Sequence, residues 1–171
     1  MAIYHFSAKV ISRASGRSAV AAAAYRAAER LDDERLGRAH DFTAKAGVVH
    51  SEVLLPEGAP GRWRDRVTLW YEVEAGERRH DAQLARDVEI ALPRELSRAE
   101  GIALAQDFVR EEFVACGMAA DLNVHWGRGG DGEAQPHAHV MMTMRRVEGD
   151  GFGPKERGWN GRELLTGWRE R

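Results

Sequence analysis

Apolar and polar residues alternate along five segments of the chain, which is the pattern of strands that bury one face. In the stretch DVEIAL, for example, Val88, Ile90 and Leu92 share one face, whereas Asp87 and Glu89 share the other. The five segments are residues 3–11, 47–55, 87–92, 121–126 and 136–145. The last two flank a glycine-rich loop, so we expect them to pair as an antiparallel hairpin.

The stretch SAVAAAAYRAAERLDDER, residues 18–35, is dense in strong helix formers and predicts the first helix. Ser15 or Ser18 is placed to cap its N-terminus. At the other end of the chain, the segment after Arg146 begins as a loop and becomes helical near Arg162.

Two further helices are expected between the strands. One of them carries apolar residues at helical spacing, namely Trp63, Val67, Trp70 and Val73. The other begins at a capping box formed by Ser97 and Glu100 and ends at Gly117. This order of elements predicts an α+β domain in which one largely antiparallel sheet carries helices on its apolar face.

The composition is that of an ordinary globular domain. The chain has 171 residues, of which 43% are hydrophobic, and a formal charge of −2, so any polyanion must be held by a local patch. No apolar stretch approaches the ~20 residues that cross a bilayer, and the N-terminus does not have the form of an export signal. A single cysteine, Cys116, excludes an internal disulfide framework. We therefore expect one domain, residues 1–171, in the cytoplasm without membrane insertion; its uncapped end at Arg171 indicates a fragment of a longer chain.

Three histidines are predicted to converge on one face of the sheet. His137 and His139 are two residues apart on a strand, so both side chains leave the same face. Antiparallel pairing around the glycine-rich loop brings His125 opposite His137. Three neutral imidazoles with open positions suit a divalent ion kept for catalysis, although an HxH pair alone also occurs as packed or solvent-facing residues. The remaining histidines lack such partners and are interpreted as structural or exposed: His5, His40, His50 and His80.

Two further side chains could take part in chemistry. Glu89, or Asp87 beside it, lies on the polar face of an otherwise apolar strand, where a carboxylate could orient a histidine, complete a metal site or accept a proton. A solvated sheet edge explains this carboxylate equally well. Tyr25 is one large phenol in an alanine-rich helix and is a candidate nucleophile, whereas an aromatic residue in such a helix is commonly part of the core.

Several motifs, taken in order, resemble the MobA/MobL relaxases of conjugative and mobilizable plasmids, and particularly the TraA-type relaxase domains of Ti-like and rhizobial plasmids. These motifs are IYHFSAKVISR, SAVAAAAYRAAERL with Tyr25, EVLLP, EIALPREL, and DLNVHW followed by PHAHVMMTMR. The pair His137 and His139 matches the His-hydrophobic-His signature of HUH endonucleases. The resemblance covers essentially the whole chain, and it implies a single relaxase (nickase) domain whose five-stranded antiparallel palm has helices packed on one face.

The resemblance implies a metal-dependent endonuclease that nicks one strand of single-stranded DNA at a plasmid origin of transfer and transfers that strand. By the same resemblance, Tyr25 attacks the scissile phosphate and leaves a 5′-phosphotyrosyl adduct and a free 3′-OH. His125, His137 and His139 hold Mg²⁺ or Mn²⁺ against the phosphate. Glu89 is the residue that best matches the auxiliary carboxylate of the family.

The implied partners are single-stranded origin DNA with an adjacent hairpin, accessory relaxosome proteins and type IV secretion proteins in the bacterial cytoplasm. Five basic side chains near the N-terminus could line this DNA: Arg13, Arg17, Arg26, Arg30 and Arg38. Two alternatives stay open at this point. One is a three-histidine phosphoesterase that activates water while Tyr25 is merely packed. The other is a noncatalytic DNA-binding or replication-initiation module in which the histidines are structural.

Overall fold

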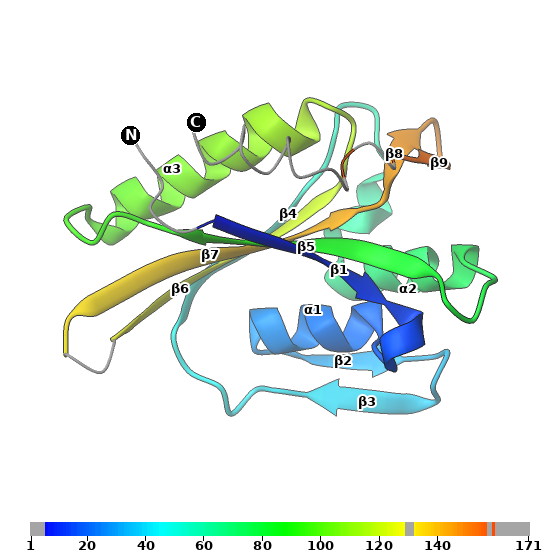
Figure 1. Cartoon of the computed structure of the whole chain (residues 1–171), viewed down its shortest axis with the longest axis horizontal. Coiled ribbons are helices and arrows are strands. Elements are labelled where there is room, and N and C mark those ends of the chain that lie inside the picture. The colour runs from blue at the N-terminus through cyan, green and yellow to red at the C-terminus, as the bar shows by residue number, and fades with distance from the viewer. Residues whose placement is uncertain (1–5, 129–131, 157–158, 160–171) are drawn as a thin grey trace.

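The computed structural model describes residues 6–128, 132–156 and 159. Five strands form one antiparallel sheet in the order β1-β5-β7-β6-β4 (Figure 1). These strands are β1 (Phe6–Ser12), β4 (Val48–Leu54), β5 (Gln83–Ala91), β6 (Ala120–Arg128) and β7 (Ala134–Thr143). Each overlaps one of the alternating segments of the sequence. The α+β class and the antiparallel five-stranded sheet are therefore confirmed.

In the described part of the chain three α-helices flank the sheet: α1 (Ala19–Ala27), α2 (Arg66–Gly76) and α3 (Arg98–Val109). Short helical turns precede or extend them: η1 (Arg13–Ser15), η2 (Gly61–Arg64) and the π-turn η3 (Arg110–Val114). Ser18 caps α1, because its Oγ accepts the backbone N–H of Ala21 at 3.3 Å. The capping box of Ser97 and Glu100 is confirmed at the start of α3. Gly117, with φ of +98°, lies in the turn after η3, as expected for a residue that ends a helix.

Helices cover both faces of the sheet, so the expectation that they pack on one face is wrong in this respect. Helix α3 lies on one side (Figure 1) and packs against the apolar face that includes Val88, Leu122 and Val140. Helices α1 and α2 lie on the opposite side, where Ile11 and Met141 contribute to a second core. The alanines of α1 add little bulk, which lets this helix lie close to the sheet. The face of the sheet that α1 and α2 cover is thus apolar beneath these helices and polar beside the end of α1.

The helix expected over residues 18–35 is correct only in its first half. Helix α1 ends at Ala27, and Ala28 adopts the left-handed region with φ of +55°. The chain then forms a hairpin of β2 (Arg30–Asp33) and β3 (Arg38–Asp41). Leu31 is buried in the second core, so the alternation of buried and exposed positions in this segment outweighs its helix propensity.

Asp33 connects this hairpin to the start of α1 by hydrogen bonds. Its environment indicates that the stability of the fold depends on pH. Its carboxylate accepts hydrogen bonds from Ser18 Oγ at 2.7 Å and His40 Nε2 at 3.0 Å. Burial alone would raise the pKa of Asp33, but the hydrogen bonds from Ser18, His40 and the backbone of Leu36 lower it overall. Because its pKa is lower in the folded state, the ionised Asp33 carboxylate stabilises the fold above about pH 4. This stabilisation is lost as the pH falls through the pKa of Asp33 in the folded protein.

We therefore expect Asp33→Asn to lower the free energy of unfolding at pH 7 by about 1–3 kcal/mol and to flatten its decline in acid. Denaturant titrations of both proteins between pH 7 and pH 3 measure this difference. If the free energy of unfolding of the two proteins differed by the same amount at every pH, the stabilising role of the ionised carboxylate would be contradicted.

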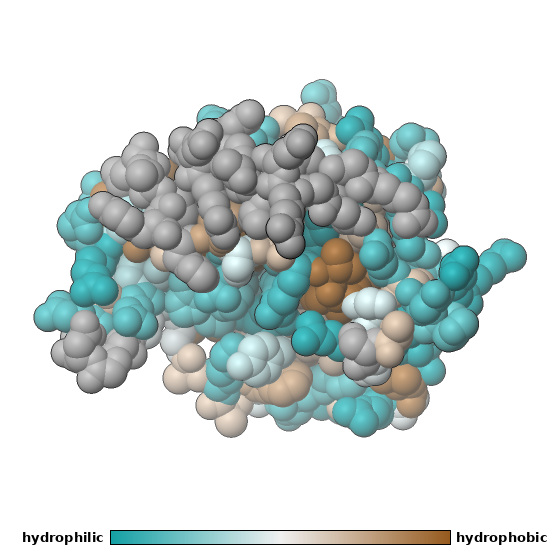
Figure 2. All heavy atoms as spheres, viewed as in Figure 1, coloured by the Kyte–Doolittle hydropathy of each residue, from teal (hydrophilic) through white to brown (hydrophobic). Residues whose placement is uncertain are grey.

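A second hairpin follows β7, where a loop was expected. Strands β8 (Arg145–Glu148) and β9 (Gly151–Lys155) pair, and Phe152 stacks on Trp63 with ring centroids 4.3 Å apart. The helix expected near Arg162 lies outside the described residues. Among the helices described, none is long and apolar enough to cross a membrane. Figure 2 shows a mostly hydrophilic surface whose largest hydrophobic patch in this view lies right of the centre.

Candidate active site

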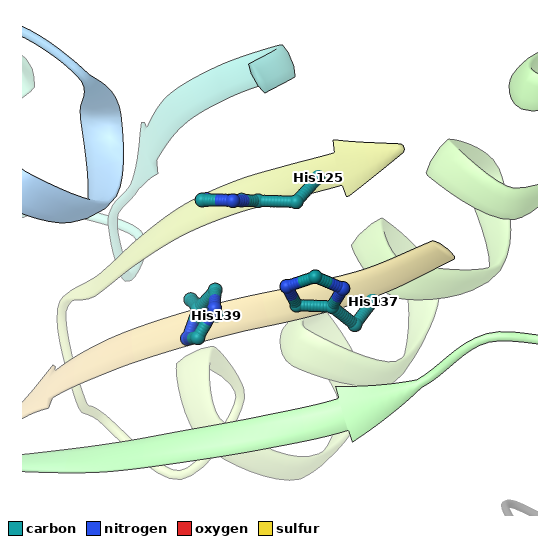
Figure 3. Close-up of side chains that lie close together, drawn as sticks. All are labelled: His125, His137 and His139. Carbon is teal, nitrogen blue, oxygen red and sulfur yellow. The ribbon is translucent and has the colours of Figure 1, made fainter. Parts of the chain in front are cut away.

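The three histidines meet on the face of the sheet that α1 and α2 cover. His125 of β6 lies directly opposite His137 of β7, and His139 follows two residues later on the same face (Figure 3). Their ring centroids are 4.7 to 5.1 Å apart, and one potential ligand atom from each lies within 4.8 Å of the others. The predicted convergence is confirmed. Strand periodicity puts His137 and His139 on one face, and the register of the hairpin puts His125 opposite His137. The role of the three histidines as metal ligands stays a prediction.

Hydrogen bonds to backbone carbonyls orient two of the three rings. His125 Nε2 donates to the carbonyl oxygen of Arg26 at 2.9 Å, and His137 Nδ1 donates to that of Gln135 at 3.1 Å. Each of these rings keeps its other nitrogen as a lone-pair donor. His139 Nδ1 is buried and has no hydrogen-bond partner among the described residues.

The charge state of the cluster suits a metal ion. Burial lowers the pKa of His125 to about 4 and that of His139 to about 3, so both rings are neutral at pH 7. Neutral imidazoles are the form that binds divalent cations. A buried nitrogen without a partner, as in His139, costs free energy that a bound ion would offset. The residues present therefore fit a divalent metal.

Tyr25 lies in the last turn of α1, next to the residue whose carbonyl accepts the bond from His125. Its side chain is 48% exposed, so it is not the core residue that its alanine-rich surroundings also allowed. The ring packs edge to face on Phe42, with centroids 5.2 Å apart, and Lys45 Nζ lies 3.6 Å from the ring centroid. Tyr25 is thus an accessible phenol whose neighbour in the chain, Arg26, is hydrogen-bonded to His125.

Two carboxylates of β5 lie on the histidine face, and their partners differ. Asp87 is buried and forms a bidentate ion pair with Arg26, with N···O distances of 2.7 and 3.0 Å. Glu89 is half-buried and is the direct cross-strand neighbour of His139. It also lines a cleft of about 340 Å³ together with His137 and Arg94. Glu89 is therefore the carboxylate of this pair that faces the cleft beside the cluster.

The five arginines expected to line DNA fall into two groups. Arg17 and Arg38 are exposed and line a cleft of about 440 Å³ that follows α1 to Tyr25. Arg30 is exposed on β2 and pairs with Asp32 at 3.3 Å. Arg26 lines the same cleft and binds Asp87, whereas Arg13 binds Glu74 and backbone carbonyls near the end of α2. A DNA contact of these five arginines stays a prediction.

The other histidines do not join the cluster in the described structure. His40 is buried against Asp33, His50 bonds to Glu52, and His80 is exposed. His5 lies outside the described residues. Trp126, the residue after His125, points to the opposite face and packs closely over Gly101 of α3.

A buried polar network lies on the same face of β6 as His125. Arg66 of α2 forms an ion pair with Asp121, in which its Nε donates to both carboxylate oxygens at 2.8 and 3.0 Å, and Trp70 Nε1 donates to the same carboxylate at 2.9 Å. Asn123 Nδ2 donates to Asp121 at 3.1 Å, and Arg66 also binds Glu29, just after α1, at 2.7 Å. The network ties α2 and the end of α1 to the strand that carries His125. Arg66 and Asp121 are 55 residues apart in the chain, so their pairing could not be predicted from the sequence.

We expect Asp121→Ala to lower the free energy of unfolding by about 3–5 kcal/mol, because it leaves the buried guanidinium of Arg66 without its main partner. Replacing the pair together, as Asp121→Leu with Arg66→Met, should cost less than the single change. Urea unfolding of the three proteins measures the difference, with Asp81→Ala, which breaks an exposed pair with Arg79, as a nearly neutral control. A double variant as unstable as the single one would contradict this account.

Comparison with known proteins is consistent with this arrangement. A model of the MobA/MobL family matches residues 17–169, and the chain belongs to this family, as its motifs indicated. The chain is 45% identical over 166 residues to the conjugal transfer protein TraA of Agrobacterium fabrum, in an alignment that covers 91% of this chain and 15% of that protein. It is 41% identical over 172 residues to the mobilization protein MobL of Acidithiobacillus ferridurans, covering 88% of this chain and 45% of that one.

A solved structure described as "Molecular Basis of Vancomycin Resistance Transfer in Staphylococcus aureus" has the same fold. It superposes with a TM-score of 0.86 at 34% sequence identity, covering 98% of this chain and 87% of that chain. The chain therefore spans most of that solved domain but only a minor part of the TraA and MobL relatives.

Proposed function

We propose that this chain is the DNA-nicking domain of a plasmid transfer protein. It cuts one strand at an origin of transfer and carries that strand as a covalent adduct, which initiates conjugative transfer. The observation that carries the proposal is the placement of an exposed tyrosine at the end of α1, whose next residue is hydrogen-bonded to one histidine of a cluster of three. Membership of the MobA/MobL family and the names of the conjugal transfer and mobilization relatives support it.

In the proposed reaction Tyr25 is the nucleophile. Its phenol loses a proton to solvent, the bond from Oη to phosphorus forms, and the bond from phosphorus to the 3′-oxygen breaks. The 3′-oxygen takes up a proton and leaves as the free 3′-OH of the upstream fragment, while the downstream fragment stays on Tyr25 through its 5′-phosphate. Attack by a 3′-OH on the aryl phosphate ester reverses these bond changes and reseals DNA without ATP.

His125, His137 and His139 would hold Mg²⁺ or Mn²⁺ in this scheme. A bound divalent ion neutralises charge on the nonbridging phosphate oxygens and orients the phosphate. The carbonyls of Arg26 and Gln135 fix two of the rings, so the chain itself sets the direction of their free nitrogens.

Glu89 is proposed as the auxiliary carboxylate, because it neighbours His139 and faces the cleft beside His137. There it can orient a histidine or accept a proton. Arg17 and Arg38 are proposed to contact the DNA backbone along the cleft that leads to Tyr25. Arg30 is proposed to do so from its exposed position on β2. Such contacts make binding fall steeply with salt. Single-stranded origin DNA with its adjacent hairpin is the proposed partner, in the bacterial cytoplasm with relaxosome and type IV secretion proteins.

The test is incubation with 3′-labelled single-stranded origin DNA and Mn²⁺, followed by a denaturing gel. The proposal predicts a labelled band that migrates as a protein–DNA adduct and disappears on protease treatment. A phosphoesterase that uses water would release labelled DNA without any adduct, and a noncatalytic binding module would leave the DNA intact. Either of these outcomes would reject the proposal.

A further inference from the structure

Lys45 makes two contacts with the proposed nucleophile. It lies in the loop between β3 and β4, where its Nζ donates a hydrogen bond to the backbone carbonyl oxygen of Tyr25 at 3.1 Å. The same ammonium is 3.6 Å from the centroid of the Tyr25 ring, well inside the range of a cation–π interaction. One positive charge thus holds both the main chain and the phenol ring of this residue.

The charge of Lys45 has no partner carboxylate within ion-pair distance in the described part of the chain. Its neighbour Arg26 is neutralised by Asp87, whereas Lys45 faces carbonyl and aromatic groups. Burial, and then the nearby charge of Arg26, lower the pKa of Lys45 from its usual value. A partly desolvated ammonium beside another cation is held at an electrostatic cost, which an anion at this position would offset.

The surroundings indicate where such an anion would lie. Lys45 and His125 both bind carbonyl oxygens in the last turn of α1, those of Tyr25 and Arg26 respectively. The ammonium therefore lies against Tyr25 at the end of α1, one residue before the carbonyl group that binds His125.

We propose that Lys45 is a further catalytic residue, whose ammonium stabilises the negative charge that develops on the Tyr25 oxygen and the phosphate during strand transfer. This inference rests on the proposed function. A cation within about 4–6 Å favours the charged form of a phenol, and it acts without reorganisation because it is already in place. It serves both directions of the reaction, since the phenolate is the nucleophile in nicking and the leaving group in resealing.

The test compares single-turnover adduct formation, at saturating origin DNA and Mn²⁺, in the native chain, Lys45→Met and Lys45→Arg. We expect Lys45→Met to slow adduct formation by about 10²- to 10³-fold, and Lys45→Arg to recover most of this loss because it keeps a cation. DNA affinity should change by much less than the rate. Arg79→Met, which removes an exposed cation paired with Asp81, is the matched control.

A second measurement separates stabilisation of the phenolate from mere support of the loop. Tyr25→difluorotyrosine supplies a more acidic phenol, and it should accelerate Lys45→Met by a larger factor than it accelerates the native chain. Equal factors in both backgrounds, or a Lys45→Met rate within about three-fold of the native rate, would overturn the inference while leaving the proposed function intact. Absence of any adduct in the native chain would instead reject the proposed function, and the role of Lys45 with it.

Discussion

Tyr25→Phe is expected to abolish the protein–DNA adduct and to slow nicking by a factor on the order of 10⁴ to 10⁶. The change removes only the phenolic oxygen, so the packing of the ring on Phe42 and its contact with Lys45 can persist. Without that oxygen no bond to phosphorus forms, and water is left as a poorly placed substitute. Adduct on a denaturing gel and nicked DNA on a sequencing gel measure the two losses separately.

Tyr71→Phe is the matched control for this experiment. Tyr71 lies half-buried on α2, and its replacement removes the same atom from the chain. It should leave the adduct at the native level. Persistence of the adduct in Tyr25→Phe would show that another residue is the nucleophile. Retained nicking without any adduct would instead favour the phosphoesterase alternative.

Removal of one imidazole should be nearly as damaging as removal of the phenol. We expect His139→Leu to weaken Mn²⁺ binding by at least about 100-fold and to slow adduct formation on the order of 10³-fold, because the ion supplies several kcal/mol of charge stabilisation. Isothermal titration with Mn²⁺ reports the binding, and single-turnover assays report the rate. His80→Ala, which removes an exposed histidine, should change neither.

The stability of His139→Leu distinguishes loss of a metal site from loss of the fold. His139 Nδ1 is buried without a partner in the described structure, so leucine at this position removes an unsatisfied polar atom. The metal-free variant should therefore unfold at the same free energy as the native chain or up to about 2 kcal/mol higher. A variant that unfolds much more easily and binds Mn²⁺ normally would contradict the role given to this residue.

The histidine cluster could be predicted from the sequence because it depends on two local rules. Strand periodicity places His137 and His139 on one face, and hairpin pairing places His125 opposite His137. The same rules correctly place Val88, Ile90 and Leu92 in the core on the other face. No contact between distant segments had to be known for these predictions.

The end of α1 could not be predicted in this way. Residues 28–35 favour a helix by composition, but Ala28 turns left-handed and Leu31 is buried as part of a hairpin. The presence of helices on both faces was missed for a related reason, because alternation shows which face is apolar but not which helix covers the other one. Tertiary burial decided both features.

Ion pairs between distant residues were the second feature that could not be predicted from the sequence. Arg13 and Arg26 are near the N-terminus, and the sequence did not show that both bind carboxylates that are 61 residues away along the chain. Lys45 gave no signal, because its importance comes from a loop that folds back over the end of α1. Contacts at such separations depend on the fold and leave no pattern in nearby residues.

The most direct test of the central claim is the mass of the peptide that carries the DNA. After reaction with origin DNA and digestion by nuclease and trypsin, cleavage at Arg17 and Arg26 gives the peptide SAVAAAAYR, in which Tyr25 is the sole tyrosine. Our account predicts that this peptide, or its extension to Arg30 where the nucleotide shields Arg26, carries a nucleotide joined by a phosphodiester to Tyr25. A nucleotide on any other peptide, or cleaved DNA with no peptide attached, would contradict it.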